Sequence, residues 1–273
     1  MPLSPGVELL LAPNPSLMTG PGTNTFLVSD GIAGCVVIDP GPDDAGHLDR
    51  IAAAAQPHGG IQSILITHGH PDHVEGAAAL RERTGAPILA YSRAGSPAAD
   101  TMLADDQLVV IGTRRLRALH TPGHRFDHLC FLLEDSHALF AGDLVAGEGT
   151  VVIAPPEGDL LDYLASLRRL QALDLALLLP AHGPQIEDPA TLLAEYLAHR
   201  QMREDQIIAE LARGPRTVAE LVPPIYAEVD PRLYPMAAQS VTAHLLKLER
   251  ERRAAQDDAT PPVWRLTARA MSS

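Results

Sequence analysis

The stretch Ile61-Gln-Ser-Ile-Leu-Ile66, followed at once by Thr67-His68-Gly-His70-Pro-Asp72-His73, is the most informative part of this 273-residue chain. The short apolar run, rich in β-branched residues, predicts a buried strand. Because Pro71 does not continue a strand, we expect a loop and then a helix over Val74–Arg83. That loop holds four side chains whose nitrogen and oxygen atoms are typical ligands of zinc, manganese or iron: His68, His70, Asp72 and His73.

Three later segments repeat this arrangement, in which an apolar run ends in a metal-binding side chain. They are Thr121-Pro-Gly-His124 after Leu116–Leu119, Ala141-Gly-Asp143 after Ala138–Phe140, and Leu179-Pro-Ala-His182-Gly183 at the end of Leu175–Leu179. Each alone is weak evidence, since a His at a strand end is most often a hydrogen-bonded turn residue. Together the four segments supply five His and two Asp, enough ligands for two metal ions that share a bridge.

Such a pair of metals, about 3.5–4 Å apart, holds a bridging water and lowers its pKa, which creates a hydroxide at neutral pH. One metal polarises the carbonyl or phosphoryl oxygen while the other stabilises the leaving group. No nucleophile elbow or triad spacing competes with this interpretation. The sequence therefore predicts a dinuclear metal-dependent hydrolase, with Asp72 as the residue that carries a proton to the leaving group.

The ordered ligand set resembles that of the metallo-β-lactamase superfamily, over roughly residues 7–187. The resemblance implies an α/β fold, a four-layer αββα sandwich with the metals at one edge of the two sheets. It also implies that His68, His70 and His124 hold one metal, that Asp72, His73 and His182 hold the other, and that Asp143 bridges them. The lactam-cleaving members lack the bridging Asp, so Asp143 argues against an antibiotic lactamase.

Three segments resemble one branch in particular, that of β-lactamase-like protein 2: residues 14–28, Thr121-Pro-Gly-His-Arg-Phe-Asp-His128 and the C-terminal tail. This branch joins the sandwich to a winged-helix-like domain and includes an RNA-cleaving mitochondrial member. The chain departs from that member at Gly69, where the other has a large aromatic residue. A Gly there predicts an open floor beneath the site.

The remaining apolar runs predict the strands and helices of a first domain over residues 1–187. We expect strands at Val7–Ala12, Thr25–Ser29, Gly34–Asp39, Pro87–Tyr91, Leu108–Ile111, Leu129–Leu133 and Leu173–Leu179, with helices at Asp43–Gln56 and Asp159–Leu170. Cys35 and Cys130 lie within such runs and are expected as buried thiols. Asp127 and His128 are candidates to orient the ligand His124, with an ordinary turn as the alternative.

Residues 188–273 predict a small winged-helix-like domain. A long helix over Ala190–Ala212 is followed by Thr217, a predicted N-cap with Glu220 completing a capping box. A helix from Met236 to about Arg253 and a wing strand at Val263–Thr267 complete the pattern. In the long helix, four side chains share one face, either as substrate contacts or as polar contacts between the domains: Tyr196, His199, Arg200 and Arg203.

Charge argues against nucleic-acid binding by this tail. Residues 1–190 contain 10 basic and 23 acidic residues, and residues 191–273 contain 11 of each. A nucleic-acid domain normally has a basic excess. We therefore expect the tail to shape the groove, duplex DNA binding being unlikely, and the hypothesis of a non-catalytic winged-helix binding protein falls behind that of an enzyme.

Two substrate classes stay open: a phosphodiester, such as a short single-stranded RNA, which we place first, and a thioester, ester or lactone of the glyoxalase II type. We expect two divalent metals, with zinc ahead of manganese or iron. The N-terminus lacks a signal-like basic and apolar pattern and no run has the length of a membrane span, so we expect a cytoplasmic location and no membrane contact. Nothing in the sequence indicates an oligomeric state.

Overall fold

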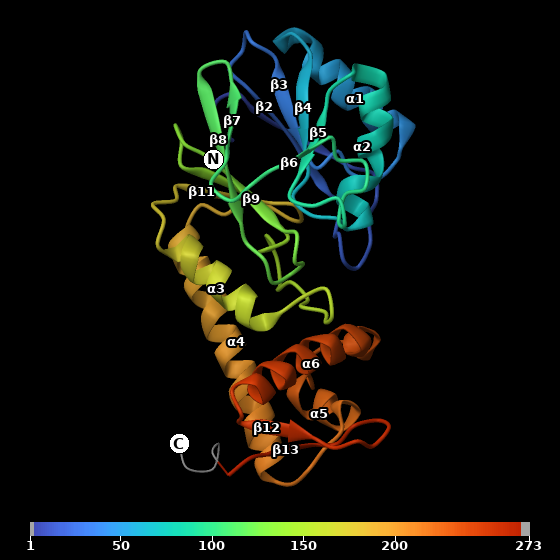
Figure 1. Ribbon diagram of the computed structural model, residues 1–273, viewed down its shortest axis with the longest axis vertical. Coiled ribbons are helices and arrows are strands. Elements are labelled where there is room, and N and C mark those ends of the chain that lie inside the picture. Colours follow the sequence, from blue (N-terminus) through green and yellow to red (C-terminus); the bar gives the residue numbers. More distant parts are fainter. Residues whose placement is uncertain (1–2, 269–273) are drawn as a thin grey trace.

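The computed structural model of the chain describes residues 3–268, so residues 1–2 and 269–273, the outer ends of the two expected domains, lie outside it. Two sheets face each other in the upper part of Figure 1. The first contains, in spatial order, β1 (Val7–Leu11), β2 (Asn24–Ser29), β3 (Cys35–Ile38), β4 (Ile61–Leu65), β5 (Ile88–Ala90) and β6 (Thr101–Met102). The second contains β11 (Leu177–Pro180), β10 (Ala138–Gly142), β9 (Leu129–Leu133), β8 (Arg114–His120) and β7 (Leu108–Ile111).

The central strands are apolar on both faces because both faces are buried. In β2, Phe26 and Val28 point into the core between the sheets, whereas Leu27 packs into the core on the outer face. In β10, Phe140 lies between the sheets, 5.1 Å from Phe26 between ring centroids, and Leu139 faces outward. The sequences of these strands therefore do not alternate between polar and apolar residues, although successive side chains point to opposite faces of the sheet.

Helices cover the outer face of each sheet, which confirms the four-layer αββα sandwich. The helices α1 (Ala45–Ala55), which continues into the 3₁₀ turn η1 (Gln56–His58), and α2 (Pro71–Thr84) place Leu48, Ile51 and Leu80 on the first sheet. The helix α3 (Leu160–Gln171) places Tyr163 and Leu167 on the second.

The C-terminal part is built around a separate apolar core. It contains α4 (Pro189–Ala212), α5 (Val218–Ile225), the 3₁₀ turn η2 (Pro231–Leu233), α6 (Tyr234–Arg250) and the two-stranded wing β12 (Ala254–Gln256) with β13 (Trp264–Leu266). Thr217 caps α5, and its capping box with Glu220 is present as predicted. Figure 1 shows α4 running from α3 down into this part. Accordingly, Leu193 belongs to the core on the second sheet and Ile207 to the C-terminal core.

The structure corrects several predicted boundaries. The helix α2 begins at Pro71, with His70 as its N-cap, so Asp72 and His73 lie in its first turn and not in a loop. Proline is favoured at a first helical position, where its missing N–H has no partner to lose. The short strand β6 was not predicted, and β11 begins at Leu177 instead of Leu173. The expected domain boundary between residues 187 and 188 falls at Asp188, the N-cap of α4; the division itself stays a prediction.

Two further predictions concern the residues 3–268. Cys35 and Cys130 are buried free thiols, as expected, and burial raises their pKa values to about 11 and about 12. Within the described part of the chain, no helix combines the length and apolar character that crossing a membrane requires.

Candidate metal centre

The predicted ligands meet because their strands end at one edge of the sandwich. His68 follows β4, His124 follows β8, Asp143 follows β10 and His182 follows β11. The strands β10 and β11 are parallel, and β8 runs in the same direction because β9 lies antiparallel to both β8 and β10. Their C-terminal ends therefore come together, and all seven predicted ligands lie in two adjoining groups.

The first group consists of His68, His70, His124 and one oxygen of Asp143. The Nδ1 atom of His70 lies 2.8 Å from Nε2 of His68 and 3.0 Å from Nε2 of His124. Burial, and then the neighbouring His124, lower the pKa of His70 to about 3, so its imidazole is neutral at pH 7. Three neutral imidazoles with converging nitrogens have the chemistry of a metal-binding group.

The second group consists of Asp72, His73 and His182. The Oδ2 atom of Asp72 lies 3.2 Å from Nε2 of His182 and 3.5 Å from Nε2 of His73. The Oγ of Thr23 donates a hydrogen bond of 3.3 Å to the same oxygen, and Asn14 in turn donates to Thr23. The segment over residues 14–28, noted in the sequence for its family likeness, thus positions the carboxylate of Asp72.

Asp143 lies between the two groups and turns one oxygen toward each. Its Oδ2 is 3.6 Å from Nε2 of His124 and 3.8 Å from Nε2 of His68. Its Oδ1 is 3.3 Å from Nε2 of His182 and 3.6 Å from Nε2 of His73. Burial alone would raise the pKa of Asp143, but the surrounding imidazoles, His73 first, hold it well below its usual value. An ionised carboxylate in this position suits a bridging ligand.

One orphaned atom shows that the residues fit a metal. The Nε2 atom of His73 is buried and has no hydrogen-bond partner among residues 3–268, although it faces the carboxylates of Asp72 and Asp143. A buried polar atom without a partner is costly, and a bound cation would satisfy it. The grouping matches the one that the family resemblance implied, and ligation itself stays a prediction.

Asp39 is a supporting residue that the sequence did not reveal. It is 1% exposed and has a φ angle of +51° directly after β3. Its Oδ2 accepts hydrogen bonds of 2.8 Å from Nδ1 of His73 and 2.7 Å from Oγ of Thr67, and its Oδ1 accepts one of 2.8 Å from the Thr67 backbone. Asp39 therefore directs Nε2 of His73 toward the centre. Its position at a strand end was the one available signal.

Asp127 and His128 support the centre, but they do not orient His124 as expected. Oδ2 of Asp127 accepts a hydrogen bond of 3.1 Å from the backbone N–H of Gly69, and Nε2 of His128 accepts one of 3.1 Å from the backbone N–H of Asp143. His124 is held instead by the carbonyl of Val152, to which its Nδ1 donates at 2.9 Å. That carbonyl belongs to a loop distant in sequence, which the local pattern did not indicate.

The comparisons with known proteins agree with this geometry. The metallo-beta-lactamase superfamily matches residues 18–182, more than half of the chain, and the beta-lactamase associated winged helix domain matches residues 217–264.

The chain belongs to the metallo-β-lactamase superfamily. It is 32% identical over 269 residues to the Beta-lactamase-like protein 2 homolog of Drosophila melanogaster, which covers 91% of this chain and 89% of the relative. It is also 32% identical over 272 residues to the atrochrysone carboxyl ACP thioesterase of Aspergillus fumigatus, covering 92% and 83%. A crystal structure of a beta-lactamase domain protein from Burkholderia ambifaria matches with a TM-score of 0.84 over 98% of this chain and 93% of that one, and at 22% identity it shows the fold. The chain is accordingly an enzyme, a hydrolase of this superfamily.

Gly69 does not open the floor of the site, contrary to expectation. A Cβ atom built at Gly69 would lie 2.1 Å from the backbone oxygen of Gly95, so the space is already filled. A Cβ atom at Gly95 would in turn lie 1.4 Å from Oδ2 of Asp127, the oxygen that accepts the Gly69 hydrogen bond. Glycine at both positions lets two backbones and one carboxylate approach closely.

The predicted face of α4 reaches the site from the C-terminal part. Tyr196 is 3% exposed, and its hydroxyl accepts a hydrogen bond of 2.9 Å from the backbone N–H of Ala146, three residues after Asp143. His199, Arg200 and Arg203 line a pocket that also contains His124, Asp143 and His182. Tyr196 therefore makes the expected polar contact between the two parts of the chain, whereas substrate contact by the other three residues, which border a cavity, stays a prediction.

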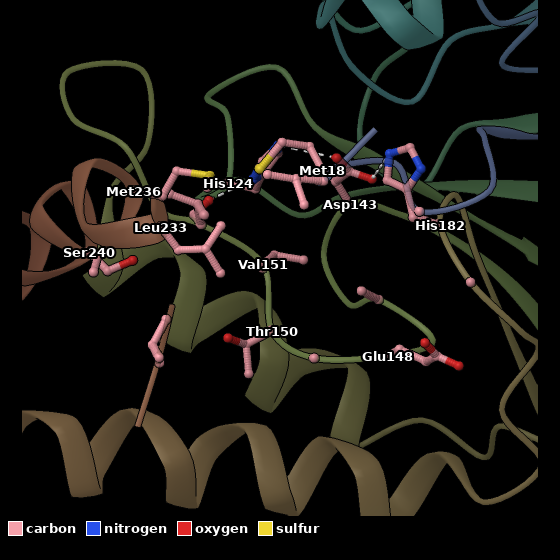
Figure 2. A pocket seen from close by; sticks show the side chains of 18 of the residues that line it. Met18, His124, Asp143, Glu148, Thr150, Val151, His182, Leu233, Met236 and Ser240 are labelled. Carbon is pink, nitrogen blue, oxygen red and sulfur yellow. Dashed lines mark hydrogen bonds and ion pairs between the residues drawn. The ribbon is translucent and has the colours of Figure 1, made fainter. Parts of the chain in front are cut away.

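That pocket has a volume of about 510 Å³ and lies between the candidate metal centre and the C-terminal part. Figure 2 shows Leu233, Met236 and Ser240 on one side of the pocket and Asp143 and His182 on the other, with His124 between them. Leu17 and Met18, 73% and 54% exposed, stand at its border. Exposed large apolar side chains beside a cavity are typical of a ligand-binding surface.

Proposed function

We propose that this enzyme is a dinuclear metal-dependent thioester hydrolase. One observation supports it above the others: a largely apolar pocket opens directly onto the seven-ligand cluster. The relative named as an atrochrysone carboxyl ACP thioesterase supports the same class, since it aligns over 92% of this chain. A thioester combines a carbonyl, suited to the cluster, with an acyl group, suited to the pocket.

Two divalent ions, with zinc proposed first and manganese or iron as alternatives, fit the donor set of five imidazoles and two carboxylates. His68, His70 and His124 would hold one ion, Asp72, His73 and His182 the other, and Asp143 both. When bound, such ions supply a water of lowered pKa and polarise the substrate carbonyl. The chain itself has to hold the ligands in place, exclude water and move a proton.

Asp72 is the proposed proton carrier. It is only partly buried, and its Oδ2 already interacts with Oγ of Thr23 and Nε2 of His182. Burial would raise the pKa of this carboxyl, but His182 and His73 lower it overall, so Asp72 starts ionised and able to accept a proton. In a hydrolysis that proton then passes to the departing thiolate. Thr23 keeps the carboxylate turned toward the centre throughout.

The lining of the pocket reverses the order of substrates that the sequence favoured. A phosphodiester of single-stranded RNA is a charged chain that needs a basic groove and exposed stacking faces. Two arginines, Arg200 and Arg203, lie at one place in the pocket, and beside them it presents a set of aliphatic and thioether side chains: Leu17, Met18, Val151, Val152, Val229, Leu233, Met236 and Ala237. Burying an acyl chain against these groups is favourable by about 25 cal/mol per Å² of apolar surface.

The winged-helix part, on this proposal, forms a wall of the pocket. Tyr226, Val229, Leu233, Met236, Ala237 and Ser240 all come from it. Several of its arginines are paired with acidic neighbours, for example Arg213 with Glu210 at 2.5 Å and Arg232 with Asp230 at 2.6 Å. Such pairs leave little basic surface for duplex DNA. The cytoplasmic location expected from the sequence stays a prediction.

A substrate panel tests the proposed function. Metal-loaded protein is assayed with hexanoyl N-acetylcysteamine thioester, S-lactoylglutathione, bis-p-nitrophenyl phosphate, single-stranded RNA and nitrocefin. We expect metal-dependent release of thiol that stops when a chelator removes the ions and returns on reconstitution. His182→Ala should abolish it, whereas His137→Ala, at an exposed turn outside the cluster, should not. Faster hydrolysis of RNA or the phosphodiester than of either thioester would refute the proposal.

A further inference from the structure

Two arginines in the pocket have no acidic partner. Neither Arg200 nor Arg203 forms an ion pair with any carboxylate in the described part of the chain, and Arg200 is only 3% exposed. Glu204, which follows Arg203 directly in the same helix, is instead paired with Lys247 and Arg253, each at 2.7 Å. Both arginines line the cavity that contains Asp143 and His182.

Neutral groups hold these arginines in place. Arg200 donates from Nη2 to the carbonyl of Val151 at 2.6 Å and lies over the ring of Tyr163, with 5.1 Å between the Cζ atom and the ring centroid. Arg203 donates from Nη1 to the carbonyl of Ile225 at 2.6 Å and lies 4.4 Å from the ring centroid of Tyr226. These contacts fix the orientation of the guanidinium groups without neutralising their charge.

Each guanidinium also has a donor that is not used. The Nε atoms of Arg200 and Arg203 are buried and have no hydrogen-bond partner among residues 3–268. A buried cation that has an unpaired donor and no anionic partner is unfavourable. Guanidinium donors suit the planar geometry of a carboxylate particularly well.

The neighbourhood of these two side chains is positive, although the whole chain has a net charge of −13. Burial, and then Arg200 and Arg203, lower the pKa of His199 to about 4. The acidic residues that line the pocket are Asp143, which belongs to the cluster, and Glu148. Figure 2 shows Glu148 on the opposite side of the pocket from Leu233, Met236 and Ser240. Neither of these carboxylates forms an ion pair with Arg200 or Arg203.

We propose that the substrate is a thioester whose acyl group carries a carboxylate, and that Arg203 and Arg200 bind this carboxylate while the thioester carbonyl lies at the metal cluster. This inference rests on the proposed function and specifies its substrate class. The acyl side is favoured over the leaving group because Arg200 is almost fully enclosed. A carrier protein or nucleotide attached to the sulfur requires open solvent, such as that beside Leu17 and Met18.

A matched pair of substrates tests the proposal in the unmodified enzyme. Hexanoyl and 5-carboxypentanoyl thioesters of N-acetylcysteamine have the same chain length and the same phosphate-free leaving group, and differ in the terminal carboxylate. Hydrogen bonds to a charged group correspond to about a tenfold to a hundredfold preference. We expect kcat/KM to be higher by that factor for the carboxylated substrate, mainly through KM. Equal values, or a preference for hexanoyl, would overturn the proposal whatever any variant does.

Two variants locate the preference. Arg203→Met keeps an aliphatic side chain but removes the charge, and should erase the preference, so that kcat/KM for the carboxylated substrate falls by about tenfold or more relative to that for hexanoyl. Arg213→Met is the control, since it removes a cation from the C-cap of the same helix, where Arg213 is paired with Glu210 outside the pocket. If both variants lower both substrates alike, the charge of Arg203 has no role in specificity. Arg203→Lys should restore part of the preference.

Two further experiments determine whether the arginines bind the acyl group or the leaving group, and whether the anion site exists independently of thioester hydrolysis. If hexanoyl-coenzyme A, whose leaving group carries phosphates, is the substrate that Arg203→Met impairs selectively, the arginines bind the leaving group and the acyl assignment is wrong. Calorimetric titration with adipate and hexanoate measures binding without turnover, because each acid offers one carboxylate to the metals and adipate alone offers a second. We expect adipate to bind more tightly than hexanoate, and Arg203→Met to remove this difference. If adipate binds in this way but no thioester is hydrolysed, the proposed function is refuted and the anion site is not. Equal binding of the two acids would count against the anion site itself.

Discussion

Replacing Asp39 by Asn changes one acceptor atom beneath the metal centre and keeps the shape of the side chain. In the native protein, Oδ2 of Asp39 accepts hydrogen bonds from Nδ1 of His73 and Oγ of Thr67. The amide NH₂ of Asn can only donate. The Thr67 hydroxyl adapts by rotating, but His73 becomes an acceptor at Nδ1 only by moving its proton to Nε2.

The size of the effect follows from that tautomer change. Nε2 of His73 faces Asp72 and Asp143 and is the atom proposed to bind the metal. A proton there has to be lost before ligation. Loss of such a supporting hydrogen bond typically lowers metal affinity by about 10- to 100-fold, or about 1.4–2.8 kcal/mol. We expect this loss at the site formed by Asp72, His73 and His182, with the other site little affected.

The assay is a competition titration of each variant with a chelator of known metal affinity, which resolves a strong and a weak site. Asp30→Asn is the matched control, because Asp30 also follows a strand of the first sheet and accepts backbone hydrogen bonds from Ile32 and Ala33. It lies at the opposite edge, since β2 and β3 are antiparallel. If Asp39→Asn binds both metals as tightly as the control, the proposed orienting role of Asp39 is refuted.

Three other perturbations have defined outcomes. Asp143→Ala removes the carboxylate that faces both groups, so metal occupancy and turnover should fall together, turnover by about 10²-fold or more; a variant with both metals and near-normal rates would contradict the bridging role. Glu204→Gln should reduce the loss of stability in acid. Burial raises the pKa of Glu204, but His244, Lys247 and Arg253 outweigh burial and lower the pKa from 4.5 to about 2. The ion pairs of Glu204 therefore stabilise the native fold above about pH 4.5, and this stabilisation is lost as the pH falls toward about 2. Urea unfolding at pH 7 and pH 3 measures this, and an unchanged difference between the two pH values would refute it. Ending the chain after Glu187 removes Leu193 and Tyr196 from the core on the second sheet. The melting temperature should therefore drop, or the protein should aggregate, to a greater extent than for a chain that ends after Arg213. A fully soluble product of equal stability would show that α4 contributes little to this core.

The sandwich and its seven candidate ligands were predictable because the signals are local. Each ligand follows an apolar run within a few residues, so strand pattern and motif point to the same place. The start of α2 was missed for a local reason as well. Pro71 after an apolar run indicates the end of a strand, but proline also favours the first turn of a helix, and in the structure Asp72 and His73 lie in that turn and not in a loop.

The contacts that orient the centre were not predictable, because their partners are distant in sequence. Asp39 precedes His73 by 34 positions, and the carbonyl that holds His124 belongs to Val152. A single Asp or carbonyl after a strand gives no pattern by which to select it. The crowding at Gly69 depends on the backbone of Gly95, which the sequence does not place.

The pocket was not predictable from the sequence either, because its lining residues are distant from one another in the chain. One part of it is an exception. The spacing of His199, Arg200 and Arg203 correctly grouped them on one face of α4. Which surface this face meets depends on how α4 packs on α3 and α6. That packing also brings Leu233, Met236 and Ser240 to the cavity, residues whose sequence context indicates only a turn and a helix.

The most direct test of the dinuclear centre is the number of metal ions per chain. The protein is stripped with a chelator, reconstituted with excess zinc or manganese, freed of unbound ions and measured by elemental analysis against protein concentration. The seven residues that form two adjoining groups predict two ions per chain. A value of one or less, reached with each metal on folded protein, would contradict the account.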